Sequence, residues 1–468
     1  MKKLAIVCLI VVYILSSISV FAAEMPDDTS ITSGSNSLDA QMPILGNQLI
    51  DGNMKSAILY EVNSDTLMYA YNADEKLPPS SLLKILTALI AIEKGNLSDV
   101  VTVQESVLAT LDEDAAKVKL AVDEVVTVKD LIYCMMVASG NDAAVVLADH
   151  VLGSQQAFVA EMNRYAAELG CINTNFTNVH GLHDENQYTT ARDMARILAK
   201  AIENEEFCAC FGARYYTVPE TNKAEERKLS SQNYLINNDQ DVNYFDERVT
   251  GSRTALANDR SRGVASVAEV NDMKLICIVM GAGSKYEDDG YTVRVYGGYN
   301  ETKKMLDLAF NGYKTAQLLF PHQVIIQKPV MNGSSDVSIG TKDAAYSVIP
   351  DDMIQNGLVY RYVNEVPLSA PVEKGQRVST LQIWCGNVCV SQNDLYALNS
   401  VKSVNAILEN DGNDQSSVGV FKVILFVLGV LAGLVVVSFG ALYFLRITRI
   451  AKTKRHRRRN RVYRRRSR

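Results

Sequence analysis

The tetrapeptide Ser81-Leu82-Leu83-Lys84 combines a hydroxyl and an amine at a spacing that suits catalysis. On a helix that begins at Ser81, residues i and i+3 share a face, so the lysine amine comes within reach of the serine hydroxyl. The residues that follow are apolar on nearly every face, so we expect a buried core helix over Ser81–Glu93. Burial would lower the pKa of Lys84 toward that of a general base for the Ser81 nucleophile. The alternative is a serine that starts a helix and a lysine that reaches solvent.

A second pair of polar side chains lies in Ser139-Gly140-Asn141, between two predicted helices, Val128–Ala138 and Ala143–Leu152. In a tight turn, a serine and an asparagine two residues apart can point into one cleft. The serine would shuttle protons there, and the asparagine amide would contact substrate or lysine. Taken alone, this tripeptide indicates only a turn.

The third feature is Thr250-Gly251 at the start of a predicted strand, where glycine permits close approach of a substrate backbone. The three features follow the order of a known set, S-x-x-K, S-x-N and K-T-G. The lysine position of that set is occupied by Val249. Because side chains alternate along a strand, we expect positions 249, 251 and 253 to share a face, with Arg253 as a substitute cation.

These motifs and their surroundings resemble the low-molecular-weight penicillin-binding proteins, which are serine-type D-alanyl-D-alanine carboxypeptidases. The resemblance covers about residues 46–405 and includes the C-terminal β domain of that family. The similar stretches are Pro79–Ala88, Met136–Ala144, Phe176–Asp184, Tyr188–Asp193, Glu365–Leu368 and Ala370–Gln376.

The resemblance implies a role for each candidate residue. Ser81 would be acylated by the penultimate D-Ala of a peptidoglycan stem peptide ending in D-Ala-D-Ala, with Lys84 as the base. Ser139 and Asn141 would relay protons and hold the acyl-enzyme until water hydrolyses it. The resemblance also implies an oxyanion hole from the backbone N–H groups of Ser81 and Ser252, β-lactam antibiotics as acylating inhibitors, and no metal or organic cofactor.

Val249 leaves the activity open. An altered enzyme would bind substrate through Thr250, Gly251, Ser252 and Arg253, and this is the interpretation that we favour. A pseudoenzyme that binds muropeptides without cutting them is the alternative. A β-lactamase is less favoured because the sequence lacks a plausible deacylating glutamate motif.

His180, His183 and Asp184 look like metal ligands because two histidines and an aspartate fall within five residues. The H-x-x-H spacing lies in a glycine-containing turn, however, and not on a helix face. We therefore expect a structural role and no metal.

The elements that would position these residues predict an α/β fold. Strand patterns occur at Ser56–Val62 and Thr66–Tyr71, and again at Val264–Val270 and Met273–Gly281, with helical patterns between them. Strands at both ends predict an antiparallel sheet with a helical cluster, which is the penicillin-binding/β-lactamase-like transpeptidase domain that the resemblance implies. From about residue 323, short strands and turns predict a small all-β domain.

Both ends of the chain carry targeting signals. Met1-Lys2-Lys3 precedes the apolar run Leu4–Leu15, and Phe21–Ala23 fits a signal-peptidase site. Val423–Leu445 has 23 residues without a charge, about 34 Å as a helix, which is enough to cross a bilayer. We therefore expect a secretory signal peptide and a single C-terminal transmembrane helix.

The charge distribution sets the orientation. Residues 446–468 carry 13 Lys/Arg and no Asp/Glu, which leaves 34 Lys/Arg against 53 Asp/Glu, a net charge of −19, in the rest of the chain. An acidic body argues against duplex nucleic acid as a partner, and we expect none. Basic flanks stay in the cytoplasm, so the catalytic domain would lie outside the bacterial cell membrane. The predicted segments are a signal peptide (1–23), a linker (24–45), a carboxypeptidase-like domain (46–320), an all-β domain (321–407), a stalk (408–422), the membrane span (423–445) and a basic cytoplasmic tail (446–468).

Overall fold

The computed structural model describes residues 38, 43–45, 53–113, 115–239, 243–286, 288, 293–353, 357–363, 367–404 and 426–427. Among these residues no helix is both long and apolar enough to cross a membrane. The predicted signal peptide, stalk and tail lie outside the described residues, as does the membrane span except for Phe426 and Val427.

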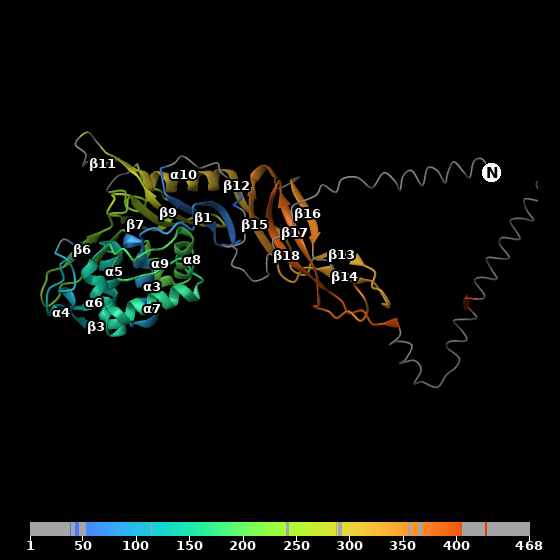
Figure 1. The fold of residues 1–468 in the computed structure, drawn as a ribbon, viewed down its shortest axis with the longest axis horizontal. Helices are drawn as coiled ribbons and strands as arrows, with labels where there is room; N and C mark the ends of the chain where they lie inside the picture. Colours follow the sequence, from blue (N-terminus) through green and yellow to red (C-terminus); the bar gives the residue numbers. More distant parts are fainter. Residues whose placement is uncertain are drawn as a thin grey trace, which may run out of the picture. The chain divides into compact units, whose positions relative to one another are not determined.

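The antiparallel sheet that the sequence predicts forms the centre of the fold, and it has five strands (Figure 1). Its two halves come from distant parts of the chain, the N-terminal hairpin and three later strands. The last strand in the order, β7, has a free edge in this sheet. The strands, in the order in which they pair, are β2 (Thr66–Tyr71), β1 (Ser56–Glu61), β9 (Met273–Ala282), β8 (Arg262–Val270) and β7 (Val249–Leu256).

A cluster of helices covers one face of this sheet and encloses the larger core (Figure 1). The central helix is α3, which is buried from Lys84 to Ala91 and contacts the helices around it. Such a helix has no solvent-facing side, as its uninterrupted apolar sequence predicts. The helices of this cluster are α3 (Lys84–Lys94), α5 (Val128–Val137), α6 (Asn141–Leu152), α7 (Gln155–Glu168), α8 (Ala191–Ala201) and α9 (Glu205–Phe211).

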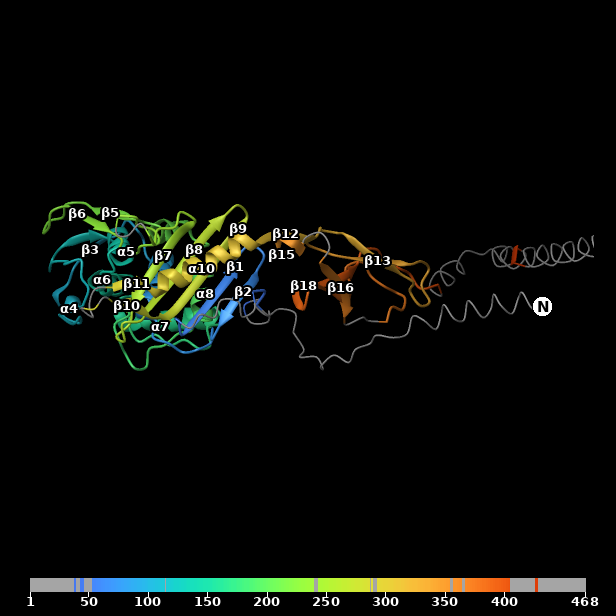
Figure 2. The ribbon, with the colours of Figure 1, turned by 90° about the horizontal axis from the view of Figure 1, so that it is seen from above.

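The opposite face of the sheet is covered by α10 (Gly297–Gly312), which the sequence analysis did not predict. Figure 2 shows this helix lying across the strands. Its Tyr299 and Leu306 are buried in a second core together with Leu275 and Val279 of β9. The sheet is therefore buried on both faces.

Short elements complete the first part of the chain. Three two-stranded sheets pair β3 with β4, β5 with β6 and β10 with β11. These elements are β3 (Val100–Thr102), α4 (Glu105–Leu108), β4 (Val125–Thr127), β5 (Tyr215–Val218), β6 (Arg227–Ser230), β10 (Ser284–Tyr286) and β11 (Val293–Tyr296).

Strands dominate the described residues from 313 to 403, as predicted for the all-β part, and this region contains no α-helix. One pair consists of β12 and β15, and the other strands form a sheet in the order β13-β14-β18-β17-β16. The elements are β12 (Tyr313–Leu319), β13 (Val324–Lys328), β14 (Val337–Gly340), β15 (Ala345–Pro350), η2 (Asp351–Met353), β16 (Leu358–Val363), β17 (Arg377–Cys385) and β18 (Val388–Ala397).

The chain divides into two compact units. The first takes in Met1–Gln323, Thr341–Asn364 and Ser379–Asp394, and the second takes in Val324–Gly340, Glu365–Val378 and Leu395–Arg468. The predicted boundary between residues 320 and 321 stays a prediction.

Strand β7 departs from the predicted alternation of its side chains. A β-bulge separates Val249 from Gly251 in the pairing of β7 with β8, and a bulge breaks the two-residue period. Val249 is buried in the second core, whereas Arg253 hydrogen-bonds to carbonyl groups at the end of α5. The prediction that positions 249 and 253 share a face is therefore wrong.

This difference predicts the effect of a lysine at position 249. Val249 is 7% exposed and packs among apolar side chains, so Val249→Lys should lower the free energy of unfolding by about 2–4 kcal/mol. Thr250→Lys is the matched control because Thr250 is the exposed neighbour on the same strand. Urea denaturation of both variants checks this, and equal stabilities would contradict the burial of Val249.

Candidate active site

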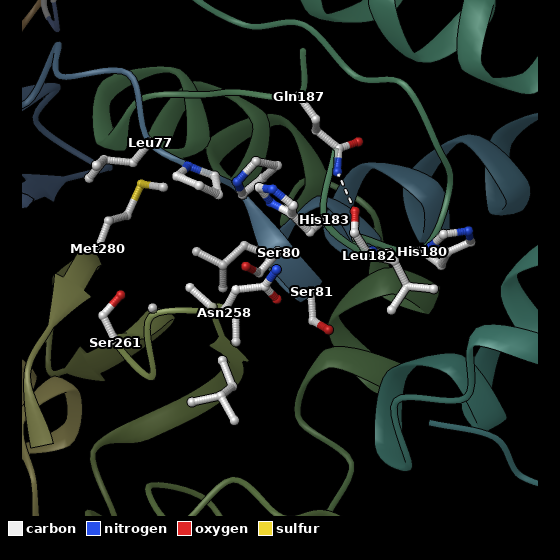
Figure 3. Close-up of a pocket in the computed structure, with 18 of the residues that line it drawn as sticks. Leu77, Ser80, Ser81, His180, Leu182, His183, Gln187, Asn258, Ser261 and Met280 are labelled. Carbon is white, nitrogen blue, oxygen red and sulfur yellow. Dashed lines mark hydrogen bonds between the residues drawn. The ribbon is translucent and has the colours of Figure 1, made fainter. Parts of the chain in front are cut away.

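A cavity of about 370 Å³ brings three distant segments together: the turn before α3, the turn before α6, and the C-terminal end of β7 with the following turn. Ser81 and Ser139 both line this cavity. In Figure 3, Ser81 lies between Asn258 on one side and His180 on the other. The structure thus brings the first two sequence motifs into one site.

Ser81 lies in a 3-10 turn, η1 (Ser80–Leu83), and the α-helix begins only at Lys84. The predicted single helix from Ser81 is therefore divided, although a 3-10 turn still aligns residues i and i+3. The Ser81 side chain has no hydrogen-bond partner among the described residues, so the direct Ser81–Lys84 bond that the spacing suggests is not formed. The serine hydroxyl is left open to the cavity.

Lys84 is fully buried, and its Nζ contacts three oxygen atoms of the second motif. They are the Ser139 carbonyl at 2.8 Å, Ser139 Oγ at 3.2 Å and Asn141 Oδ1 at 2.5 Å. A charged amine would donate to all three. A neutral amine would donate to the carbonyl and the amide oxygen and would accept from the Ser139 hydroxyl, so the site accommodates either protonation state.

The surroundings of Lys84 favour the neutral amine. Burial holds the pKa of Lys84 well below its ordinary value of 10.5, and the neighbouring Arg253 charge lowers it further. The nearby Asp142 carboxylate raises the pKa of Lys84 and so partly offsets these two effects. This carboxylate is buried and accepts hydrogen bonds from backbone N–H groups of Val118, Leu120 and Ala143. A neutral Lys84 therefore leaves one cation, Arg253, and one anion, Asp142, in the buried cluster.

Arg253 extends from β7 to both serines and is only 4% exposed. Its Nε donates to the Ser81 carbonyl at 3.1 Å, and its Nη2 donates to Ser139 Oγ at 2.8 Å. Its Nη1 donates to the carbonyls of Met135 at 3.1 Å and Met136 at 2.7 Å. Burial lowers the pKa of Arg253 to about 10, so the guanidinium is charged at neutral pH and ties the strand to both serine turns.

Three residues predicted to bind substrate lie away from the cavity. Thr250 is exposed and contacts the Val267 carbonyl, and Gly251 packs against the Phe211 ring. Ser252 is buried, where its Oγ accepts from Asn233 and donates to the Ala265 carbonyl. These assignments are corrected: the bulged first half of β7 does not reach the site.

The end of β7 lines the cavity through Ala255 and Leu256. Arg253-Thr254-Ala255 therefore stands where a K-T-G motif is expected, with a cation, a threonine and a small residue. The literal match at Thr250-Gly251 concealed this motif, whose Thr254-Ala255 lies four residues further along the chain. The sequence signal for it was the same order of residue types with arginine and alanine in place of lysine and glycine.

One backbone N–H at this end of β7 faces the free edge. The N–H of Ala257 donates to the Ser261 carbonyl at 2.9 Å, toward β8. Backbone N–H groups of an antiparallel strand point to alternate sides, so that of Leu256 points away from β8. Leu256 lines the cavity together with Ser81.

A loop that the sequence analysis treated as structural supports the nucleophile. Gly181 has φ = +90°, and a Cβ there would lie 2.1 Å from the Ser80 carbonyl oxygen. Only glycine therefore allows this loop to contact the turn that carries Ser81. Nδ1 of the preceding residue, His180, accepts a hydrogen bond from the Leu182 N–H. Burial lowers the pKa of His180 to about 4, so its ring is neutral at neutral pH.

Across the part of the chain that the structure describes, no three His, Cys, Asp or Glu side chains are grouped so that they could hold a metal ion. His183 and Asp184 line the cavity instead.

The fold and this serine–lysine site define a penicillin-binding type of acyl-transfer protein. A family model described as D-alanyl-D-alanine carboxypeptidase matches residues 46–284, and one described as penicillin-binding protein 5, C-terminal domain, matches residues 313–403. The chain belongs to the D-alanyl-D-alanine carboxypeptidase family.

Individual relatives agree with this. D-alanyl-D-alanine carboxypeptidase DacC of Escherichia coli K12 is 31% identical over 356 residues, which cover 74% of this chain and 83% of that protein. D-alanyl-D-alanine carboxypeptidase DacF of Bacillus subtilis 168 is 30% identical over 361 residues, which cover 75% of this chain and 87% of that protein. The crystal structure of penicillin-binding protein 5 from Haemophilus influenzae has a TM-score of 0.62 and 30% identity, covering 75% of this chain and 98% of that chain.

The lowered pKa of Lys84 predicts a pH-dependent stability. Unfolded Lys84 keeps its proton up to about pH 10.5, whereas folded Lys84 loses it at lower pH. The unfolded state therefore binds more protons in that window, and the contribution of Lys84 to the free energy of unfolding rises with pH, by at most about 1.4 kcal/mol per pH unit. The measurement is the difference between wild type and Lys84→Met in urea denaturation at a series of pH values. A difference that is independent of pH would show that Lys84 keeps its proton on folding.

Proposed function

We propose that this protein is a membrane-anchored serine-type D-Ala-D-Ala carboxypeptidase that removes the terminal D-Ala of peptidoglycan stem peptides through a Ser81 acyl-enzyme. The observation that carries this proposal is the fully buried Lys84, held by Ser139 and Asn141 beside an open Ser81 hydroxyl. The names of the relatives supply the substrate.

Acylation begins when the Ser81 Oγ attacks the carbonyl carbon of the penultimate D-Ala. The Ser81 proton passes to the neutral Lys84 amine, and the carbonyl oxygen becomes an oxyanion. The backbone N–H groups of Ser81 and Leu256 receive this oxyanion, with Leu256 in place of the Ser252 that the sequence suggested. Both donors belong to residues that line the cavity.

Collapse of the tetrahedral intermediate breaks the peptide bond and needs a proton on the departing nitrogen. Ser139 can deliver it because its Oγ lies 3.2 Å from Lys84 Nζ. The Ser139 hydroxyl gives its proton to the leaving D-Ala and takes the proton of Lys84 in exchange. Water then attacks the acyl-enzyme by the reverse proton path, which restores Ser81 and releases the shortened peptide.

Arg253 contributes a fixed positive charge. Four of its five N–H groups donate to Ser81, Met135, Met136 and Ser139, so little of the guanidinium is left for direct contact with substrate. Its charge keeps the Lys84 proton labile and attracts the terminal carboxylate of the peptide.

The pseudoenzyme alternative depended on Val249 in place of a catalytic-site lysine. With Arg253 as the cation of the motif, that reason no longer holds.

We also propose that Val423–Leu445 anchors the protein in the bacterial cell membrane with the carboxypeptidase part outside. The uncharged run and the basic residues after it support this proposal.

Incubation of the purified extracytoplasmic part with a fluorescent penicillin tests the enzyme. We expect a covalent label on Ser81, located by peptide mass spectrometry, and release of free D-Ala from an acyl-D-Ala-D-Ala peptide. Ser81→Ala, which removes only the hydroxyl, should abolish both. A folded wild type that neither takes the label nor releases D-Ala would favour the pseudoenzyme, and rapid loss of the label would favour a β-lactamase.

The pH dependence of acylation tests the arginine. Acylation needs the neutral amine, so its rate rises with pH through the pKa of Lys84. The Arg253 charge lowers that pKa, so Arg253→Met should move the rise to higher pH, whereas Arg253→Lys should move it much less because it keeps a cation. Rates of penicillin labelling from pH 5 to 10 provide the profiles. Superimposable profiles for wild type and Arg253→Met would remove Arg253 from this role.

A further inference from the structure

An ion pair outside the catalytic network lines the same cavity. Lys55 Nζ lies 2.8 Å from Asp259 Oδ2, and the two side chains are 49% and 51% exposed. Lys55 directly precedes β1, and Asp259 lies in the turn between β7 and β8. Among the described residues, neither side chain forms a hydrogen bond or ion pair with Ser81, Ser139 or Lys84, so the catalytic steps do not account for the pair.

Both partners are held in fixed orientations. Asp259 Oδ1 accepts from the backbone N–H of Ser261 at 3.0 Å and from its hydroxyl at 2.6 Å. The hydrogen bond from Lys55 is the main reason that the pKa of Asp259 is lowered to about 2, so this carboxylate is ionised. The Lys55 stem packs on Gly281, where φ is +65° and a Cβ would come within 2.7 Å of Lys55 Cδ.

The pair keeps unused hydrogen-bonding capacity. An ammonium has three donors, and among the described residues Lys55 Nζ uses one, toward Asp259. Oδ2 of Asp259 keeps a second lone pair, because Lys55 is its one hydrogen-bond partner within the part of the chain that the structure describes. Beside the cavity the pair therefore presents two open N–H donors next to one open carboxylate acceptor.

The proposed reaction decides which part of a substrate reaches this pair. A peptide that lies along the free edge of β7 places its carbonyl at Leu256 and its leaving group near Ser139, the proton donor, to which Arg253 is bonded. The acyl part then extends past Leu256 toward the turn that carries Asp259. Figure 3 shows Asn258 and Ser261 of this turn on the side of Ser81 opposite His180.

We propose that Lys55 and Asp259 form a specificity subsite for a zwitterionic side chain on the residue that precedes D-Ala-D-Ala. The carboxylate of that side chain accepts from the open N–H groups of Lys55, and its ammonium donates to Asp259 Oδ2. This subsite rests on the proposed carboxypeptidase function and adds the chemical class of the acyl-side residue to it.

Four peptides of the form acetyl-X-D-Ala-D-Ala separate the two charges. X is norleucine (neither charge), lysine (ammonium only), 2-aminopimelate (carboxylate only) or lysine with an added carboxylate on its ε-carbon (both charges). D-Ala release gives kcat/KM for each with the wild-type extracytoplasmic part, Lys55→Met and Asp259→Asn. Lys94→Met is the control, because Lys94 pairs with Glu161 and does not line the cavity.

The wild type should prefer the doubly charged peptide to the norleucine peptide, by about 2–5-fold for each charge, as for half-exposed ion pairs. Lys55→Met should reduce the kcat/KM ratio of carboxylate-bearing to carboxylate-free peptides toward one. Asp259→Asn should reduce the kcat/KM ratio of ammonium-bearing to ammonium-free peptides toward one. Lys94→Met should change neither ratio. A purely structural ion pair would instead lower kcat/KM for all four peptides equally.

Equal kcat/KM for the four peptides in the wild type would overturn the subsite and leave the carboxypeptidase function standing. Release of D-Ala from none of them, together with no penicillin label, would overturn the proposed function and the subsite with it.

Discussion

The site depends on the burial of two basic side chains around one hydroxyl. Ser139 Oγ accepts from Lys84 at 3.2 Å and from Arg253 at 2.8 Å, and both side chains are almost entirely removed from water. Two like charges so close together would repel strongly in an interior of low dielectric constant. The cluster is tolerable because one of the two, Lys84, can lose its proton.

The helices around the cluster offset the charge that remains. The guanidinium of Arg253 binds the carbonyls of Met135 and Met136 in the last turn of α5, where carbonyls lack helical partners and the helix dipole is negative. Asp142 lies in the first turn of α6, where a carboxylate is favoured by the positive end of the dipole. The tight connection between these helices forces Ser139 to φ = 62°, a conformation that costs about 1 kcal/mol or more for a non-glycine residue. Met136, Val137, Ala143 and Ala144, which flank this turn, are packed in the core on the helical side of the sheet.

Much of this arrangement follows from the sequence because it depends on local patterns. The all-apolar stretch after Ser81 predicts the central helix, and the hairpin Ser56–Tyr71 is indicated by two largely apolar strand-forming stretches and the polar turn between them. The bulge at Val249 could not be predicted, since it depends on pairing with β8. The literal Thr250-Gly251 match separately placed the third motif four residues before Thr254-Ala255, at the end of β7 that lines the cavity. The contact of Gly181 with Ser80 was equally hidden, because 101 positions of chain separate the two residues.

Because the third motif has an arginine in place of a lysine, the two basic side chains of the site have different roles. With a pKa of about 10, the guanidinium of Arg253 keeps its proton at neutral pH, and its planar fork can hold several carbonyls at once. Arg253 therefore stays charged at neutral pH, and it bonds both serine turns at the same time. In the mechanism that we propose, every proton that leaves Ser81 is then carried by Lys84 and Ser139. Arg253 fixes the positions of the two serine turns and raises the electrostatic potential around Lys84, and Lys84 is the group that titrates.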